Sequence, residues 1–180
     1  MLEDRLLKWQ LRNGSQDALA RVYEKYVDAM LTLAMGLLNN RAAAEDVVQD
    51  VFLSFARSAR HLRSRGSLRR YLMTGVLNRV RDCRRRRQRQ GAVAEAAEEP
   101  ACGGAGPEQA AILVEETVRL NQAVAKLPDE QREVVLLRLK GNMTFREIAR
   151  LQERPISTVL GRYRYGLERL RSVLNGEVER

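Results

Sequence analysis

Histidine and cysteine are scarce in this chain of 180 residues, which contains one histidine and two cysteines. A histidine-dependent catalytic triad or a histidine-rich metal site would rest on His61 alone. Neither Cys83 nor Cys102 has a second cysteine or a histidine at metal-ligand spacing. We therefore expect two free thiols, no metal and no bound cofactor.

Long apolar runs are also missing. No stretch approaches the ~20 apolar residues that a bilayer-spanning helix needs. Residues 1–15 lack a basic segment followed by an uninterrupted apolar run, so they do not resemble a secretory signal. These absences favour a cytoplasmic protein without membrane insertion.

Motifs that would indicate an enzyme acting on nucleic acid are absent as well. The sequence contains no glycine-rich phosphate loop of the form G-x-x-x-x-G-K-[ST] and no cluster of Asp, Glu and His at metal-binding spacing. We therefore expect a protein without catalytic activity.

Lysine is rare, whereas arginine is abundant and clustered. The 32 basic residues include only four lysines, and the net charge is +9. Thirteen arginines and one acid, Asp82, lie between Arg57 and Gln90, so the rest of the chain is slightly acidic. A GC-rich genome would enrich arginine over lysine, but it does not explain the clustering. Arginine side chains present forked donors that match phosphate groups and guanine edges.

The region from Leu127 to Arg171 has the layout of a helix-turn-helix. Thr144 and Glu147 form a T-x-x-E capping box, which predicts that a helix begins at Thr144. A polar break follows, and Pro155 suits the first turn of a second helix. Apolar residues recur in that second helix at every third or fourth position. Its opposite, exposed face carries Ser157, Thr158, Arg162, Arg164 and Arg169.

Helices are predicted in the remainder of the chain too. Ser15, Asn40 and Ser67 each stand where an N-cap precedes an amphipathic segment. Further helices are expected over Ile112–Ala125 and around Val134–Leu139, and no strand-like alternation exceeds three residues. The side chains expected to point inward include Tyr23, Phe52, Tyr71, Leu139, Ile156 and Leu174.

A segment between the two halves has a different composition. Residues 91–111 contain few large apolar side chains, two prolines, four glycines and only acidic charge, which is typical of a linker. We therefore expect an all-α protein of two small helical domains, residues 1–90 and 112–180, joined by a flexible linker over residues 91–111. The second domain contains the helix-turn-helix.

Three segments, in this order, resemble the extracytoplasmic-function group of bacterial RNA polymerase sigma factors. Ala44 to Phe52, AEDVVQDVF, is similar to the segment that docks on the clamp of the core polymerase. Ser67 to Arg85 is similar to the segment that recognises and opens the minus-ten promoter element, and the helix-turn-helix to the domain that reads the minus-thirty-five element. The resemblance implies a promoter-specificity subunit that binds core polymerase and promoter DNA, with an anti-sigma protein as a candidate third partner.

The resemblance and the chemistry of the residues together assign three sets of contacts. The polymerase-binding residues are Asp46, Gln49, Asp50 and Phe52. The residues that bind DNA at the minus-ten element are Arg63, Arg65, Arg69, Arg70, Tyr71, Asn78, Arg81 and Arg85. In the helix-turn-helix, the DNA-binding residues are Thr144, Ser157, Thr158, Arg162 and Arg164.

Each assignment has an alternative in ordinary structure. Tyr71 could be a core side chain, and Thr158 could be a packing residue. Asp82, which the resemblance places in the minus-ten segment, could pair with an arginine of its own helix. The acidic residues near Asp46 could form a solvated face that offsets the arginines. For the whole chain, the alternative is a free-standing helix-turn-helix regulator whose amino-terminal half binds a ligand or dimerises.

The sequence departs from the sigma-factor pattern at a few positions. Tyr71 stands where the family usually has tryptophan. Glu153 replaces the usual glycine of the helix-turn-helix turn, and Arg154 replaces an apolar residue. The two replacements predict a turn that is either strained or differently packed. Leu160 and Gly161 replace the common lysine and serine of the recognition helix.

Overall fold

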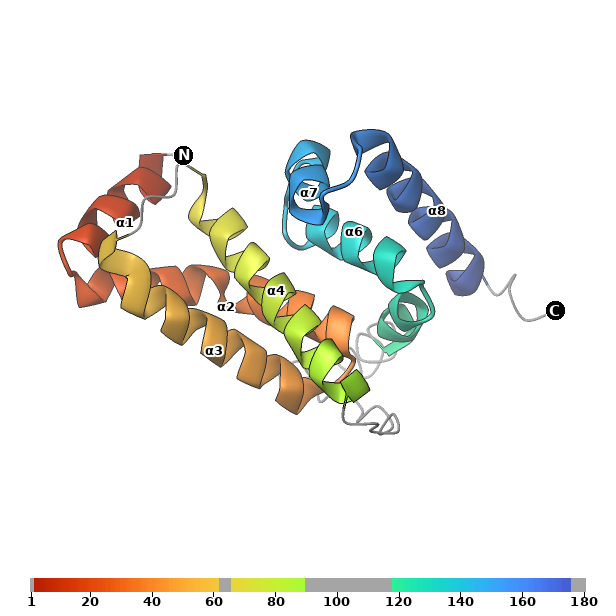
Figure 1. The fold of residues 1–180 in the computed structure, drawn as a ribbon, viewed down its shortest axis with the longest axis horizontal. Coiled ribbons are helices and arrows are strands. Elements are labelled where there is room, and N and C mark those ends of the chain that lie inside the picture. The colour runs from red at the N-terminus through yellow and green to blue at the C-terminus, as the bar shows by residue number, and fades with distance from the viewer. Residues whose placement is uncertain (1, 62–65, 90–117, 176–180) are drawn as a thin grey trace, which may run out of the picture.

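The computed structural model describes residues 2–61, 66–89 and 118–175, and all regular elements within these ranges are helical. The first part contains α1 (Leu2–Arg12), α2 (Gln16–Leu38), α3 (Arg41–Ser58), the short 3-10 helix η1 (Ala59–His61) and α4 (Leu68–Arg89). The second part contains a helical segment over residues 118–125, α6 (Asp129–Leu139), α7 (Phe145–Gln152) and α8 (Ile156–Leu174). Figure 1 shows the two parts as adjacent helical bundles.

The all-α prediction with two helical domains is thus confirmed. The predicted linker over residues 91–111 and Cys102 lie outside the described residues. Within the described ranges, no helix combines the length and the hydropathy that a bilayer span requires.

The three predicted N-caps of the first domain are confirmed. The side chain of Ser15 accepts a hydrogen bond from the Ala18 N–H at 3.2 Å, and that of Asn40 accepts one from the Ala43 N–H at 2.8 Å. Ser67 caps the start of α4 in the same way, at 3.1 Å from the Arg70 nitrogen. Each bond satisfies a backbone donor that has no partner within its helix.

The core of the first domain lies where α2, α3 and α4 meet. Met30, Phe55 and Leu72 are fully buried there. Gly75 allows α4 to approach α3 closely, because an ideal Cβ on it would lie 2.9 Å from a methyl carbon of Val51. The two helices are therefore packed closely at this position.

Two tyrosines that the periodicity predicts to be inward lie instead at the edge of this core. Tyr23 is 43% exposed and Tyr71 is 38% exposed. The prediction was wrong at both positions because a tyrosine packs its ring on apolar neighbours while its hydroxyl stays in water. Tyr71 is therefore accessible to a ligand, and the alternative that Tyr71 is a core side chain is set aside.

Helix α1 was not predicted from the sequence. Leu7 and Leu11 bury it against the first domain. The Asp4 carboxylate accepts hydrogen bonds from the Tyr26 hydroxyl at 2.8 Å and from the Leu68 N–H at 3.2 Å. Helix α1 thus fixes the start of α4. The leucines spaced by three or four residues before Gly14 were the signal that could have revealed it.

The hydrogen bonds of Asp4 set its ionisation. Burial alone would raise the pKa of Asp4, but the bonds from Tyr26 and Leu68 and the charge of Lys25 lower it below its ordinary value. The same environment raises the pKa of Tyr26, first through burial and then through the bond to Asp4. Asp4 is therefore ionised and Tyr26 neutral around neutral pH.

The second domain packs α8 and α7 on α6. Val134, Val135 and Leu137 are buried as predicted, but Leu139 is 55% exposed and Leu136 is buried in its place. Two residues at the ends of α8 that were expected inside, Ile156 and Leu174, are exposed. Leu139, Ile156 and Leu174 are all terminal residues of their helices, where fewer neighbours are available to bury a side chain.

Candidate polymerase and nucleic-acid interfaces

One face of α3 combines polar groups with an apolar groove. Asp46 and Gln49 are exposed on it. A groove of about 330 Å³ runs beside them and is lined in part by Tyr23, Phe52 and Leu53. The half-buried Phe52 ring lies 4.8 Å from the Tyr23 ring in an edge-on arrangement. Exposed apolar side chains rimmed by polar groups suit the docking of another protein.

Asp50 is the fourth predicted polymerase contact, and it is bound within the chain. Its Oδ2 accepts a hydrogen bond from Arg79 Nε of α4 at 3.0 Å. This bond to Asp50 raises the pKa of Arg79. Asp46 and Gln49 are therefore more open to a partner than Asp50 is.

A second groove, of about 550 Å³, lies between α3 and α4. Tyr71 and Asn78 line it, and the Tyr71 ring lies 5.9 Å from the ring of Phe55. An accessible aromatic ring can stack on a base, and an exposed amide can bond to a base edge. Asp82, at the far end of the groove, accepts a hydrogen bond from Arg85 at 2.6 Å, as the intrahelical alternative predicts.

Two arginines at the start of α4 extend to the second domain. Arg69 donates to the carbonyl oxygens of Lys140 at 2.6 Å and of Gly141 at 3.0 Å. A guanidinium nitrogen of Arg70 lies 3.5 Å from a carboxylate oxygen of Glu147 in α7. These predicted DNA contacts are thus engaged within the chain.

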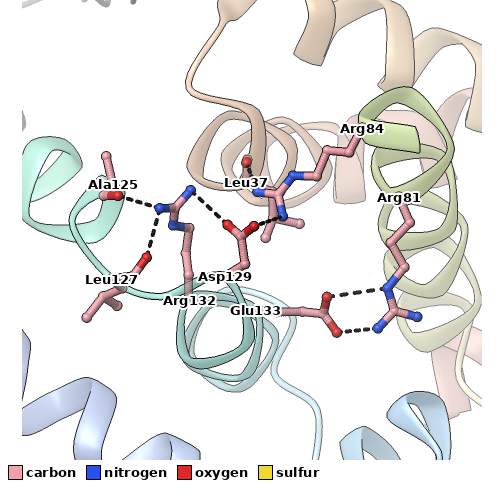
Figure 2. Close-up of polar contacts among 8 residues, drawn as sticks. All are labelled: Leu37, Arg81, Arg84, Ala125, Leu127, Asp129, Arg132 and Glu133. Carbon is pink, nitrogen blue, oxygen red and sulfur yellow. Dashed lines mark hydrogen bonds and ion pairs between the residues drawn. The ribbon is translucent and has the colours of Figure 1, made fainter. Parts of the chain in front are cut away.

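Further along α4, Arg81 also reaches the second domain, whereas Arg85 does not. Arg81 NH2 lies 2.5 Å from Oε1 of Glu133 in α6, and Figure 2 shows the two side chains pointing toward each other. Arg85 pairs within α4, with Asp82. The remaining predicted contacts of this set, Arg63 and Arg65, lie outside the described residues.

The capping box of the helix-turn-helix is confirmed. The Thr144 N–H donates to Glu147 Oε2 at 2.9 Å, and the Glu147 N–H donates to Thr144 Oγ1 at 3.3 Å. Burial alone would raise the pKa of Glu147, but the bonds from Thr144 and the charge of Arg70 lower it. The box therefore holds an ionised carboxylate at the start of α7.

The turn between α7 and α8 contains the strain that the sequence predicts. Glu153 has a φ of 52° in the left-handed region, where the family usually has glycine. A side chain with a Cβ in that conformation costs roughly 1–2 kcal/mol relative to a right-handed one. The turn nevertheless forms, because the Glu153 and Arg154 N–H groups bond to carbonyl oxygens at the end of α7.

At the front of α8, three of the predicted DNA contacts are exposed to solvent and one lies in a cleft. Ser157, Thr158 and Arg164 are exposed, so the packing alternative for Thr158 is set aside. Arg162 is less exposed than its face of the helix predicts, at 18% for its side chain. Its NH2 lies 2.6 Å from Glu130 Oε2, which draws it toward α6.

Sequence reasoning missed the acidic partners of these arginines. Asp129, Glu130 and Glu133 lie on the first two turns of α6 and bind Arg84, Arg162 and Arg81 respectively. The pattern D-E-x-x-E was visible in the sequence, where it is also typical of a helix amino terminus. The D-E-x-x-E pattern does not indicate which arginines of other segments these acids bind.

Two sequence families match the chain. Sigma-70 region 2 matches residues 22–90, which contain most of α2 and all of α3 and α4, and Sigma-70, region 4 matches residues 117–170. The RNA polymerase sigma factor CarQ of Myxococcus xanthus is 30% identical over 172 residues, with 94% of this chain and 96% of CarQ covered. The ECF sigma factor SigW of Bacillus subtilis is 27% identical over 174 residues, with 92% and 93% covered.

The chain belongs to the extracytoplasmic-function sigma factors. As such, it binds core RNA polymerase and directs it to promoters for the initiation of transcription. Both matched families are sigma-factor regions, so the alternative of a free-standing helix-turn-helix regulator is set aside.

Two solved structures share the fold of this sigma factor. CnrH, solved in complex with the cytosolic domain of CnrY, has a TM-score of 0.69 at 21% identity, with 97% of this chain and 98% of CnrH covered. RpoE, solved in complex with the anti-sigma factor NepR from Bartonella quintana, has a TM-score of 0.70 at 22% identity, with 89% and 98% covered.

Proposed function

We propose that the two domains of this sigma factor divide the promoter between them. Residues 1–90 dock on core polymerase and hold the minus-ten element, and residues 112–180 read the minus-thirty-five element, with residues 91–111 as the linker. The sigma factor adds no catalysis of its own and acts in the cytoplasm. The observation that supports this proposal is that one domain combines an exposed polar and apolar face of α3 with the arginine-bearing helix α4, while the other contains a capped helix-turn-helix.

Core polymerase binds the face of α3. Asp46 and Gln49 supply exposed polar contacts, and Phe52 supplies an apolar contact beside the groove. Asp50 contributes once Arg79 releases it. A partner that covers this face buries the edges of Tyr23 and Leu53, which are exposed in the free chain.

The minus-ten element binds along α4. Arg69, Arg70, Arg81 and Arg85 hold phosphates, together with Arg63 and Arg65 before the helix. Unstacking a base costs a few kcal/mol, so opened bases must be captured to keep the strands apart. Tyr71 stacks on such a base, and Asn78 bonds to its edge, because both line the groove between α3 and α4.

The minus-thirty-five element binds at the front of α8. Ser157, Thr158 and Arg164 are exposed there, and Thr144 lies at the start of the preceding helix. The amino-terminal residues of a recognition helix enter the major groove. Arg162 reads a guanine edge after it leaves Glu130, and Arg164 holds a phosphate.

An anti-sigma protein is a further proposed partner. The support is the fold shared with CnrH and RpoE, which were solved with the cytosolic domain of CnrY and with the anti-sigma factor NepR. An inhibitor that binds the face of α3 would compete with core polymerase.

The docking part of the proposal is tested by the double variant Asp46→Ala/Gln49→Ala. We expect its affinity for core polymerase to fall about tenfold or more, since truncation of each of the few residues that dominate an interface costs more than ~1 kcal/mol. The control is Asp28→Ala, which removes an exposed carboxylate from α2. Core binding is measured by co-elution and titration, and unchanged affinity of the double variant would contradict the proposed docking face.

A further inference from the structure

The acids of α6 bind the arginines of α4 at the contact between the domains. Figure 2 shows Arg81 and Arg84 extending from α4 toward α6. Arg84 NH1 lies 3.1 Å from Asp129 Oδ2, and its NH2 donates to the carbonyl oxygen of Leu37 at 2.5 Å. Arg81 binds Glu133, whose side chain is only 12% exposed. Arg81 and Arg84 of the first domain are therefore paired with carboxylates of the second.

A continuous polar chain extends from this contact to the recognition helix. Glu133 Oε1, which binds Arg81, also accepts a hydrogen bond from Gln152 Nε2 at 2.6 Å. Gln152 Oε1 in turn accepts one from Arg162 NH1 at 3.2 Å. One network thus engages a minus-ten arginine of α4 and the minus-thirty-five candidate of α8.

The contact also has an apolar part. Leu136 of α6 is 6% exposed, and it lies against Gly36 of α2. An ideal Cβ on Gly36 would lie 2.8 Å from Leu136 Cδ1. The two domains therefore meet through a packed side chain as well as through ion pairs.

We propose that the acidic face of α6, formed by Asp129, Glu130 and Glu133, is an internal substitute for DNA phosphate. Carboxylates and phosphates are both bound by the forked guanidinium group, and one guanidinium face holds only one of them at a time. In the free chain, Glu133 and Asp129 bind Arg81 and Arg84 of the first domain and keep the two domains in contact, while Glu130 binds Arg162 within the second domain. Promoter DNA must displace these carboxylates. The inference rests on the proposed role of Arg81 and Arg162 in DNA binding and extends that role to Arg84.

Closure has a measurable consequence for affinity. If the chain binds DNA only in its open state, its apparent affinity equals the affinity of the open state multiplied by the fraction of chains that are open. Salt weakens the partly exposed ion pairs of the closed state at the same time as it weakens binding to phosphate. The free sigma factor should therefore lose affinity for DNA less steeply with salt than a variant that cannot close.

The test uses two ways of opening the full-length chain. Asp129→Asn/Glu133→Gln removes two carboxylates from the contact, and its control, Glu24→Gln/Asp28→Asn, removes the same charge from the exposed face of α2. Gly36→Val opens the contact without a charge change, because the new side chain would collide with Leu136. Circular dichroism verifies that each variant is folded.

Two readouts are compared across these variants. Small-angle X-ray scattering gives the radius of gyration, and fluorescence anisotropy gives the affinity for a labelled promoter duplex. We expect both opening variants to be more extended than the wild type and to bind DNA about fivefold more tightly than the α2 control, as release from a mostly closed state predicts.

The inference is overturned if the wild type is already as extended as the opening variants, or if those variants bind DNA no better than the control. Transcription with core polymerase reports the proposed function separately. If the sigma factor supports specific transcription but its domains do not close, the proposal of an internal phosphate substitute is wrong and the proposed function stands. A chain that opens as expected but yields no specific transcripts contradicts the proposed function.

Discussion

Helices α4 and α8 both carry residues proposed to bind DNA, but they are held in different ways. Helix α4 is anchored at its start by Asp4 and approaches α3 closely at Gly75, and several of its arginines are engaged by the second domain. Helix α8 presents Ser157 and Thr158 to solvent, and an ideal Cβ on Gly161 would have no described atom within 4 Å. Helix α4 is therefore fixed and masked, whereas Ser157 and Thr158 at the front of α8 are open to DNA.

Matched glycine substitutions in the two helices should give the largest contrast in stability. Gly75→Ala places a methyl group against Val51 and should destabilise the first domain by about 1–3 kcal/mol through overpacking. Gly161→Ala enters open space and should stabilise the second domain by up to about 1 kcal/mol through helix propensity. Urea titration of each variant measures both effects, and equal changes at the two sites would remove the distinction between the helices.

The next contrast lies within α8, between the arginine in the cleft and the exposed one. Arg162→Ala should cost about 1–3 kcal/mol of binding at the preferred site and relax selection at one base pair of the minus-thirty-five element. Arg164→Ala should instead weaken binding to all sequences alike, as expected for a phosphate contact. Binding to a set of single-base promoter variants distinguishes the two patterns. The roles are wrong if both substitutions leave the base preference unchanged.

The anchoring of α4 by α1 should be visible in the pH dependence of stability. The folded-state pKa of Asp4 is lowered, so its contribution is fully present above the unfolded pKa of about 3.9 and is lost as the pH falls through the folded pKa. Asp4→Asn should reduce stability near neutral pH by about 1–2 kcal/mol and flatten the acid side of the stability curve. Thermal unfolding as a function of pH measures this. Glu3→Gln, which alters an exposed carboxylate paired with Lys25, is the control and should have the smaller effect.

The smallest expected effect concerns the turn that orients α8. Glu153→Gly relieves a left-handed residue and should stabilise the second domain by about 0.5–1 kcal/mol. Arg150→Gly, at an exposed position inside α7, should destabilise it by about 1 kcal/mol. Thermal unfolding measures both, and a destabilising Glu153→Gly would show that this side chain makes a contribution that outweighs its backbone strain.

The sequence predicts the features that depend on neighbouring residues. The caps at Ser15, Asn40 and Ser67 and the box of Thr144 and Glu147 are confirmed, because each bond spans only three residues. The all-α class follows from the same local patterns. The left-handed turn at Glu153 was also predictable, because the family's usual glycine marks the conformation.

The remaining features depend on contacts between distant segments. Arg81 and Glu133 are 52 positions apart, and Asp4 and Leu68 are 64 apart. Periodicity therefore could not show that Arg162 turns into a cleft or that Asp4 fixes α4. It also could not separate core rings such as Phe55 from Tyr23 and Tyr71 at the edge of the core, because both kinds lie on the apolar stripe. The roles assigned to the polymerase- and DNA-binding residues stay predictions.

Transcription from genomic DNA by core polymerase with the purified sigma factor tests the central claim most directly. We predict transcripts whose start sites share two conserved elements at minus ten and minus thirty-five, and we predict that Arg162→Ala alters the bases selected only at the upstream element. Transcripts that share no such elements, or that match those of core polymerase alone, would contradict the account.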